Sequence, residues 1–90
     1  MDTVKVSLEG AYAGWTAELR KQVSARILLE LESGEPLRAM TAFSKMVVSH
    51  NFKDLDGNPC DDVLDAPVDA LTQTLEAWGK ATQQIGRAHV

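Results

Sequence analysis

Two short segments near the N-terminus alternate between apolar and polar residues. From Thr3 to Leu8 every second residue is apolar, and the same alternation runs from Trp15 to Arg20. A period of two residues is typical of a strand with one buried face. The loop between the segments contains two glycines, which turn a chain readily. The pattern predicts a β-hairpin, and because an isolated hairpin is marginal in water, its apolar face must pack on another element.

Apolar residues then recur every three or four positions, the period of an α-helix. One such stripe lies between Ser24 and Glu32 and is followed by Gly34, which suits the left-handed conformation after a helix. A second stripe begins at Pro36, a good first-turn residue, and continues to Val48. It predicts a helix of about 13 to 15 residues, an ordinary length. The tight turn between the two stripes predicts a helical hairpin.

The segment from His50 to Cys60 interrupts the helical period. It contains Asp-Gly followed by Asn-Pro, a strong signal for a turn. A third stripe follows Pro67, with Asp65 as the candidate cap in front of it. This stripe predicts a last helix that runs to about Gln84.

These elements predict an α+β fold that is mostly helical, with an N-terminal β-hairpin packed on three helices. Ninety residues are enough for one small domain with a modest core. We expect the last helix to pack on the second one through similarly spaced apolar residues, namely Leu71, Leu75 and Trp78 on Phe43 and Val47.

The last six residues, Ile85 to Val90, are interpreted separately. The codons ATC GGA AGA GCA CAC GTC encode them, and this string matches a widely used short-read sequencing adapter whose next in-frame triplet is a stop. The alternative is a natural tail of the same composition. We interpret 85–90 as translated adapter and 1–84 as a single domain whose natural continuation after about Gln84 is different.

Composition and charge exclude several classes of function. Hydrophobic residues make up 44% of the chain, charged residues 24%, and the formal net charge is -4. An acidic chain with scattered Lys and Arg is unsuited to nucleic acid or to a polybasic membrane anchor. No apolar stretch approaches the roughly 18 residues of a membrane span. A single cysteine and an N-terminus unlike a signal peptide favour a reducing compartment, the cytoplasm.

The pattern Asp-x-Asp-x-Asn from Asp54 has the spacing with which an EF-hand loop begins. Such a loop requires Gly at its sixth position and Glu at its twelfth, where this chain has Pro59 and Asp65. We therefore interpret the segment as a structural turn without a metal. In that turn the two carboxylates cap backbone N–H groups and the glycine adopts a positive φ. The residues assigned to it are Asp54, Asp56, Gly57 and Pro59.

His50 and Cys60 are the residues best suited to nucleophilic or metal chemistry. A nucleophile pair needs an orienting third group and an oxyanion site, and a structural zinc site needs four ligands. The sequence signals neither. We interpret His50 as the C-terminal residue of a helix and Cys60 as a small, partly buried residue. We accordingly expect no enzymatic activity, no cofactor and no metal.

Two aromatic residues of the predicted hairpin are candidates for contact with a protein partner. Tyr12 lies in the loop between two glycines and has no periodic reason to be buried. Trp15 fits the core pattern of its strand, but both Trp and Tyr are enriched at interfaces. We assign Tyr12 and Trp15 as candidate partner-binding residues.

Two short motifs resemble a known family. A Glu-Gly-x-Tyr-x-Gly turn extends from Glu9 to Gly14, and V-V-S-H-N-F-K-D-L-D-G-N-P extends from Val47 to Pro59, before an acidic helix with a Trp. The arrangement resembles small tail-assembly chaperones of long-tailed bacteriophages and prophages. Many of these have Trp-Asn after an apolar helix end, then Asp-x-Asp-Gly-x-Pro. Here His50 stands where Trp is usual.

The resemblance covers most of residues 3–84 and implies a role rather than a reaction. Such chaperones coat the hydrophobic tape-measure protein while tail-tube subunits polymerise around it. The implied partners are therefore the tape-measure or the tail-tube protein, and the chain could itself assemble as an oligomer. One alternative is a structural tail or head–tail accessory subunit that stays in the finished particle. The other is a small antitoxin-like or regulatory protein that binds a single partner.

Overall fold

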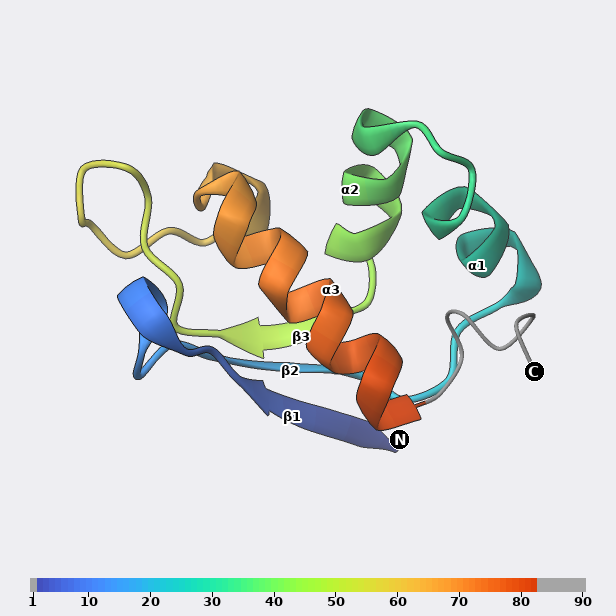
Figure 1. Cartoon of the computed structure of the whole chain (residues 1–90), viewed down its shortest axis with the longest axis horizontal. Helices are drawn as coiled ribbons and strands as arrows, with labels where there is room; N and C mark the ends of the chain where they lie inside the picture. The colour runs from blue at the N-terminus through green and yellow to red at the C-terminus, as the bar shows by residue number, and fades with distance from the viewer. Residues whose placement is uncertain (1, 83–90) are drawn as a thin grey trace.

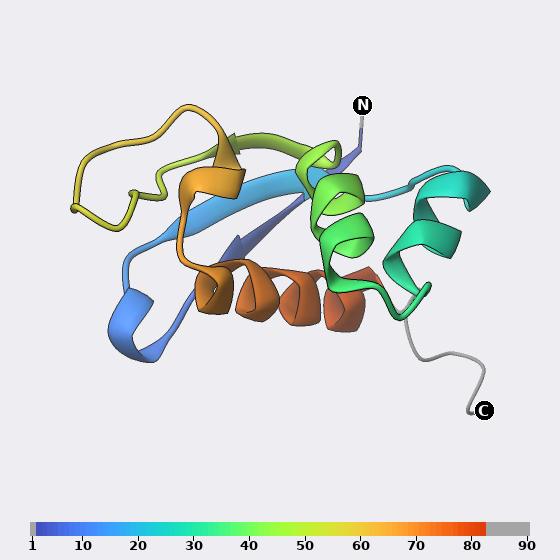
Figure 2. The same ribbon diagram turned by 90° about the horizontal axis from the view of Figure 1, so that it is seen from above.

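The computed structural model describes residues 2–82, which form one antiparallel sheet and three α-helices. The strands, in their order across the sheet, are β1 (Thr3–Ser7), β2 (Thr16–Arg20) and β3 (Val47–His50). The helices are α1 (Ala25–Leu31), α2 (Pro36–Ser44) and α3 (Val68–Thr82). The long helix α3 runs over one face of the sheet, and α1 and α2 lie toward one end of it (Figure 1, Figure 2).

The fold is α+β, but the prediction of a mostly helical fold with a two-stranded hairpin packed on three helices is wrong. Helices contain 46% of the described residues and strands 20%. The hairpin is part of a three-stranded sheet, because β3 pairs with β2. The second helix ends at Ser44 instead of continuing to Val48.

The backbone itself ends α2. The N–H groups of Lys45 and Met46 donate to carbonyls three residues back, at 3.1 and 2.9 Å, and such bonds tighten the last turn of a helix. The carbonyl of Met46 then accepts from the N–H of Arg20 at 2.9 Å, which begins the pairing with β2. Val47 and Val48 suit a strand because they are β-branched. Their spacing from the helix residues resembles a helical period only by coincidence.

The sheet has an apolar inner face and a polar outer face. The inner face is buried and consists of Val6, Leu8, Ala17 and Leu19. On the outer face, Glu18 accepts a hydrogen bond from Thr3 Oγ1 at 2.6 Å and a weaker one from Ser49 Oγ at 3.5 Å. The register of β3 shifts opposite Glu18, so that Val48 is skipped and stands 48% exposed at a β-bulge.

Trp78 joins α3 to the sheet. Its side chain is 0% exposed, and the indole Nε1–H donates to the carbonyl of Arg20, at the end of β2, at 2.8 Å. A buried N–H requires such a partner. The other large side chains that are fully buried are Phe43, Phe52, Leu19, Met46 and Thr74. These residues make one core between the sheet and the helices.

The predicted packing of the last helix on the second one is correct only in part. Leu71 and Trp78 belong to the same buried cluster as Phe43. Leu75 is half-buried and packs against the margin of that cluster. Val47 lies on β3 and not on a helix, because α2 has already ended.

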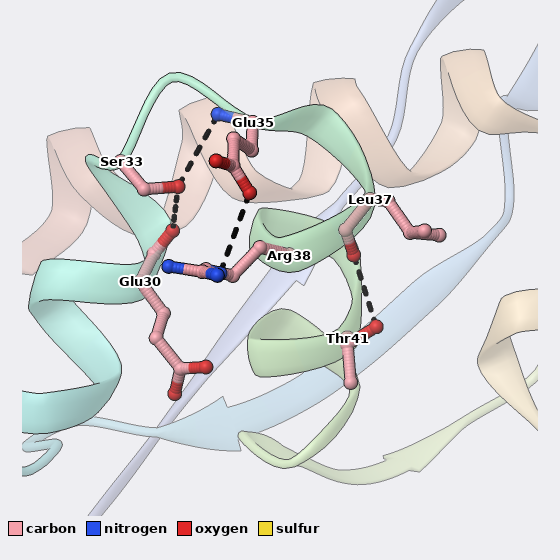
Figure 3. A network of polar contacts seen from close by, with 6 residues as sticks. All are labelled: Glu30, Ser33, Glu35, Leu37, Arg38 and Thr41. Atoms are coloured by element: carbon pink, nitrogen blue, oxygen red, sulfur yellow. Dashed lines mark hydrogen bonds and ion pairs between the residues drawn. The ribbon is translucent and has the colours of Figure 1, made fainter.

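A short turn joins α1 to α2 (Figure 3). Gly34 has a φ of 84°, in the left-handed region expected after a helix. The hydroxyl of Ser33 donates to the carbonyl of Glu30 at 2.9 Å and accepts from the N–H of Glu35 at 3.2 Å. Glu35 also forms an ion pair with Arg38 at 3.5 Å, which adds little stability because both side chains are exposed.

The start of α3 differs from the prediction. The carbonyl of Pro67 accepts from N–H groups three and four residues later, at 3.0 and 3.3 Å, so the helix begins directly after it. Asp65 does not stand in front of the helix as its cap but belongs to a separate 3-10 turn, η2 (Val63–Asp65). The helix end expected near Gln84 and residues 85–90 lie outside the described residues.

The bond between Trp78 and Arg20 can be tested by removing the N–H while keeping a large ring. We expect Trp78→Phe to lower the free energy of unfolding by about 1–3 kcal/mol, because the hydrogen bond to the Arg20 carbonyl is lost and the smaller ring leaves unfilled space in the core. Trp78→Ala should cost about 3–5 kcal/mol. The measurement is urea unfolding followed by circular dichroism. Trp15→Phe is the matched control, since the Trp15 indole N–H has no hydrogen bond within residues 2–82. Equal losses for the two Phe variants would contradict this role of the bond.

Candidate functional site

Four aromatic rings form a row at one end of the sheet. Ring centroids are 4.9 Å apart for Tyr12 and Trp15, 5.4 Å for Trp15 and Phe52, and 5.3 Å for Phe52 and His50. These separations, with tilted planes, are those of attractive aromatic pairs. Phe52 is 1% exposed and anchors the row to the core, whereas the other three rings are half-buried. We call Tyr12, Trp15, His50 and Phe52 the aromatic surface.

The loop between β1 and β2 positions Tyr12. Gly10 and Gly14 have φ angles of 66° and 93°, which only glycine adopts without strain. Between them lies the 3-10 turn η1 (Gly10–Tyr12), and the N–H of Trp15 donates to the Tyr12 carbonyl at 2.9 Å. The two glycines therefore reverse the chain tightly enough to set the Tyr12 ring against the Trp15 ring.

Asn51 ties this loop to the chain that follows β3. Its Oδ1 accepts from the N–H of Thr16 at 2.8 Å, and its Nδ2 donates to the carbonyl of Gly14 at 3.2 Å. Its own N–H donates to the Thr16 carbonyl at 3.2 Å. Asn51 and Gly14 are 37 positions apart in sequence. One side chain thus holds together the two segments that supply the aromatic surface.

Beyond Asn51 the chain makes a compact turn around Asp54. One carboxylate oxygen of Asp54 accepts from the N–H groups of Asp56 and Asn58, at 2.9 and 3.0 Å. The Asp54 backbone also bonds to Gly57 and Asn58, at 3.0 and 2.8 Å. Gly57 has a φ of 85°, as the sequence predicts. Pro59 forms an isolated β-bridge with Lys53, which closes the turn.

The turn shows no sign of a cation site. One carboxylate oxygen of Asp54 accepts hydrogen bonds within the turn itself. The exposed Asp56 contributes its backbone N–H to the turn rather than its carboxylate. The expectation that both carboxylates cap the turn therefore holds for Asp54 alone. Within residues 2–82, no group of three or more His, Cys, Asp and Glu side chains is placed to hold a metal.

His50 ends β3, so the prediction that it ends a helix is wrong. Its Nδ1 accepts from the N–H of Phe52 at 3.0 Å, which leaves Nε2–H to donate to the carbonyl of Asp61 at 3.1 Å. Both ring nitrogens are therefore engaged with backbone groups. His50 serves as a link between β3 and the segment before η2.

Cys60 is held in its protonated form. Burial raises the pKa of the thiol, and the negative charges of nearby carboxylates, Asp65 first, raise it further. Its Sγ lies 3.6 Å from the carbonyl of Phe52 and donates to it. Because only the thiolate is a strong nucleophile, this environment makes Cys60 unreactive near neutral pH.

The structure brings the two predicted contact residues, Tyr12 and Trp15, into the same row and sets the turn from Asp54 next to it in the chain. Sequence reasoning missed the part played by Asn51 and by His50. An Asn between a predicted helix and a predicted turn was a usable signal, because its amide both donates and accepts. The partners of that amide are far away in sequence, so only the folded chain identifies them.

Replacing Asn51 tests whether it holds the two segments together. We expect Asn51→Ala to lower the free energy of unfolding by about 1 kcal/mol, because two hydrogen bonds to backbone groups are lost. We also expect faster amide exchange at Thr16. Asn58→Ala is the matched control, since the Asn58 side chain makes no hydrogen bond within residues 2–82. The role assigned to Asn51 fails if both variants behave alike in urea melts and hydrogen exchange.

The turn is tested through Gly57 and through added calcium. No atom lies within 4 Å of a Cβ built at Gly57, so Gly57→Ala meets only backbone strain. We expect a loss of about 1–2 kcal/mol, and a smaller one for Gly57→Asn, which tolerates a positive φ. Thermal melts in millimolar calcium and in chelator should coincide. A reproducible rise in melting temperature with calcium, abolished by Asp54→Asn, would revive a metal site.

Comparison of the chain with protein-family models, with curated proteins and with solved structures found no match. Among residues 2–82, no helix combines the length and the apolar character that crossing a bilayer requires. The functional assignment therefore rests on the residues of this chain, on their arrangement and on the short motifs quoted above.

Proposed function

We propose that this chain is a non-enzymatic protein-binding module that acts as a tail-assembly chaperone of a long-tailed phage. In this role it holds the tape-measure protein in the host cytoplasm until tail-tube subunits polymerise around it. The aromatic surface is the contact surface, with the half-buried rings of Tyr12 and Trp15 as its contact residues.

One observation carries the proposal. The two motifs that resemble the phage family, from Glu9 to Gly14 and from Val47 to Pro59, lie far apart in the sequence but meet at one end of the sheet. Asn51 binds them together, and the rings of Tyr12 and Phe52 flank Trp15. The residues behind the resemblance are therefore held side by side in the folded chain, which supports a shared role.

The chemistry of this surface favours an apolar partner with positive charge. Half-buried aromatic rings offer large contact areas at a small entropic cost, which is why Tyr and Trp dominate binding hot spots. Leu55, 82% exposed, lies in the adjoining turn. Exposed carboxylates of Asp56, Asp61 and Asp62 follow in the same stretch of chain. An amphipathic helical segment with Lys or Arg beside its apolar face would complement both features.

Co-expression with the tape-measure protein of the same phage tests the proposal. We expect the chain to keep the tape-measure protein in the soluble fraction and to co-purify with it, less so at high salt because charge contributes. Tyr12→Ser should abolish co-purification and lower the free energy of unfolding by only about 0.5–1.5 kcal/mol, the value of its ring contact with Trp15, so that the chain stays folded. Leu37→Ser is the control, since Leu37 is 82% exposed but lies on α2.

The proposal is wrong if the tape-measure protein stays insoluble with the wild-type chain, or if both substitutions have the same effect. Mass spectrometry of purified phage particles separates a chaperone from a structural subunit. A chaperone is absent from finished particles, whereas a tail or head–tail accessory subunit is present in stoichiometric amounts.

A further inference from the structure

One edge of the sheet has free backbone hydrogen-bonding groups. In an antiparallel pair, residues alternate between those that bond to the neighbouring strand and those that point away from it. Leu8 donates to the Trp15 carbonyl at 2.9 Å, and the Asp2 carbonyl accepts from Lys21 at 3.0 Å. The even-numbered residues of β1 therefore bond to β2. The odd-numbered ones, Thr3, Lys5 and Ser7, direct their N–H and C=O groups away from the sheet.

The bonds on the far side of β2 support this assignment. Arg20, the partner of Thr3, bonds to Met46, which precedes β3. Thr16, the partner of Ser7, bonds to Asn51, which follows β3. The N–H and C=O groups of Arg20 and Thr16 thus point away from β1. No backbone group of Thr3, Lys5 or Ser7 forms a further hydrogen bond with any other part of residues 2–82. Three donors and three acceptors stand in a row along the β1 edge.

The two edges of the sheet differ. The β3 edge has the bulge at Val48, and the ring of His50 ties that strand to Asp61. A bulge and a covering segment are common protections against the addition of another strand. Among residues 2–82 the β1 edge has neither, and its five residues pair regularly with β2. Its protection is the exposed Lys5 in the middle of the strand. The free edge ends at Glu9, whose N–H donates a hydrogen bond to the side-chain Oε1 of Gln73.

A groove of about 580 Å³ continues this edge between the end of β1 and α3. Ser7, Glu9 and Gly10 lie on its strand side. The helix side is lined by Gln73, Glu76, Ala77 and Lys80. The two elements lie beside one another in both views (Figure 1, Figure 2). A strand added to β1 would place alternate side chains on this flank of α3, next to the half-buried Val4.

Charge decides which occupant fits. Lys5 stands exposed in the middle of the edge and has no ion pair within residues 2–82. Its cross-strand neighbour Glu18 is bonded to Thr3 and Ser49 instead. A second copy paired antiparallel over the whole edge would set this lysine opposite the same lysine of the copy, which is unfavourable. An incoming segment with a carboxylate at that position is favoured.

We propose that β1 accepts an extended segment of a protein partner as a fourth strand. The segment alternates apolar side chains toward α3 with polar ones on the open face, and it has an acidic residue opposite Lys5. This site is distinct from the aromatic surface and does not depend on the function proposed for it.

Two synthetic peptides test the site, with the sequences DTVEVSL and DTVKVSL. Each is titrated into the isotope-labelled 90-residue chain and followed by NMR. We expect the Glu peptide to shift and protect the amides of Thr3, Lys5 and Ser7, and to bind about fivefold more tightly than the Lys peptide. The Lys5→Glu variant should reverse this preference, and Lys5→Thr should abolish it. A Glu peptide N-methylated at alternate residues should not bind, because it lacks the required donors.

Several results would overturn the proposal. The proposal fails if neither peptide shifts the β1 amides, or if the shifts fall on Tyr12 and Trp15 instead. It also fails if the preference for the Glu peptide persists in Lys5→Glu. Sedimentation of the chain alone addresses the remaining occupant. A dimer that shifts the same β1 amides as concentration rises would assign the edge to a second copy and refute the partner segment.

Discussion

The hydrogen bond from the Trp78 indole to the Arg20 carbonyl is the contact on which the rest of the structure depends. It fastens the longest helix to the end of the central strand, and the Trp78 side chain that makes it is fully buried. A domain of this size buries only a modest share of its surface, so a single aromatic residue makes up a large part of the core. With α3 fixed across the sheet, the inner faces of β1 and β2 are covered.

The central position of β2 explains why two surfaces with different properties occur on one small domain. Both neighbouring strands pair with β2. The chain segments that precede and follow those strands determine the structure around the sheet. At one end, Asn51 leaves β3 and binds back to the start of β2, which gathers the aromatic rings. Along the side of β1, nothing among residues 2–82 bonds to the outward backbone groups, which leaves an edge able to accept another strand.

Polar contacts near the aromatic surface build structure and leave little reactive capacity. The His50 ring bonds to two backbone groups, Asp54 bonds to its own turn, and the raised pKa of Cys60 keeps that thiol protonated. The buried hydroxyl of Thr74 is satisfied within its helix by the Ala70 carbonyl at 2.7 Å. The half-buried rings of Tyr12 and Trp15 lie beside these contacts and belong to residue types that are enriched at protein interfaces.

The sequence alone determined the features that depend on neighbouring residues. Period-two alternation located β1 and β2, and the apolar stripe between Ser24 and Glu32 located α1. Gly34 and Gly57 have the positive φ angles that their turns require. Only the tertiary structure decided that Val47 and Val48 leave the helix and join the sheet, because the bonds of β3 are made to a strand about 30 residues earlier, whose register no local pattern encodes. The same holds for the role of Asn51 and for the open edge of β1, since both follow from which strand lies beside which.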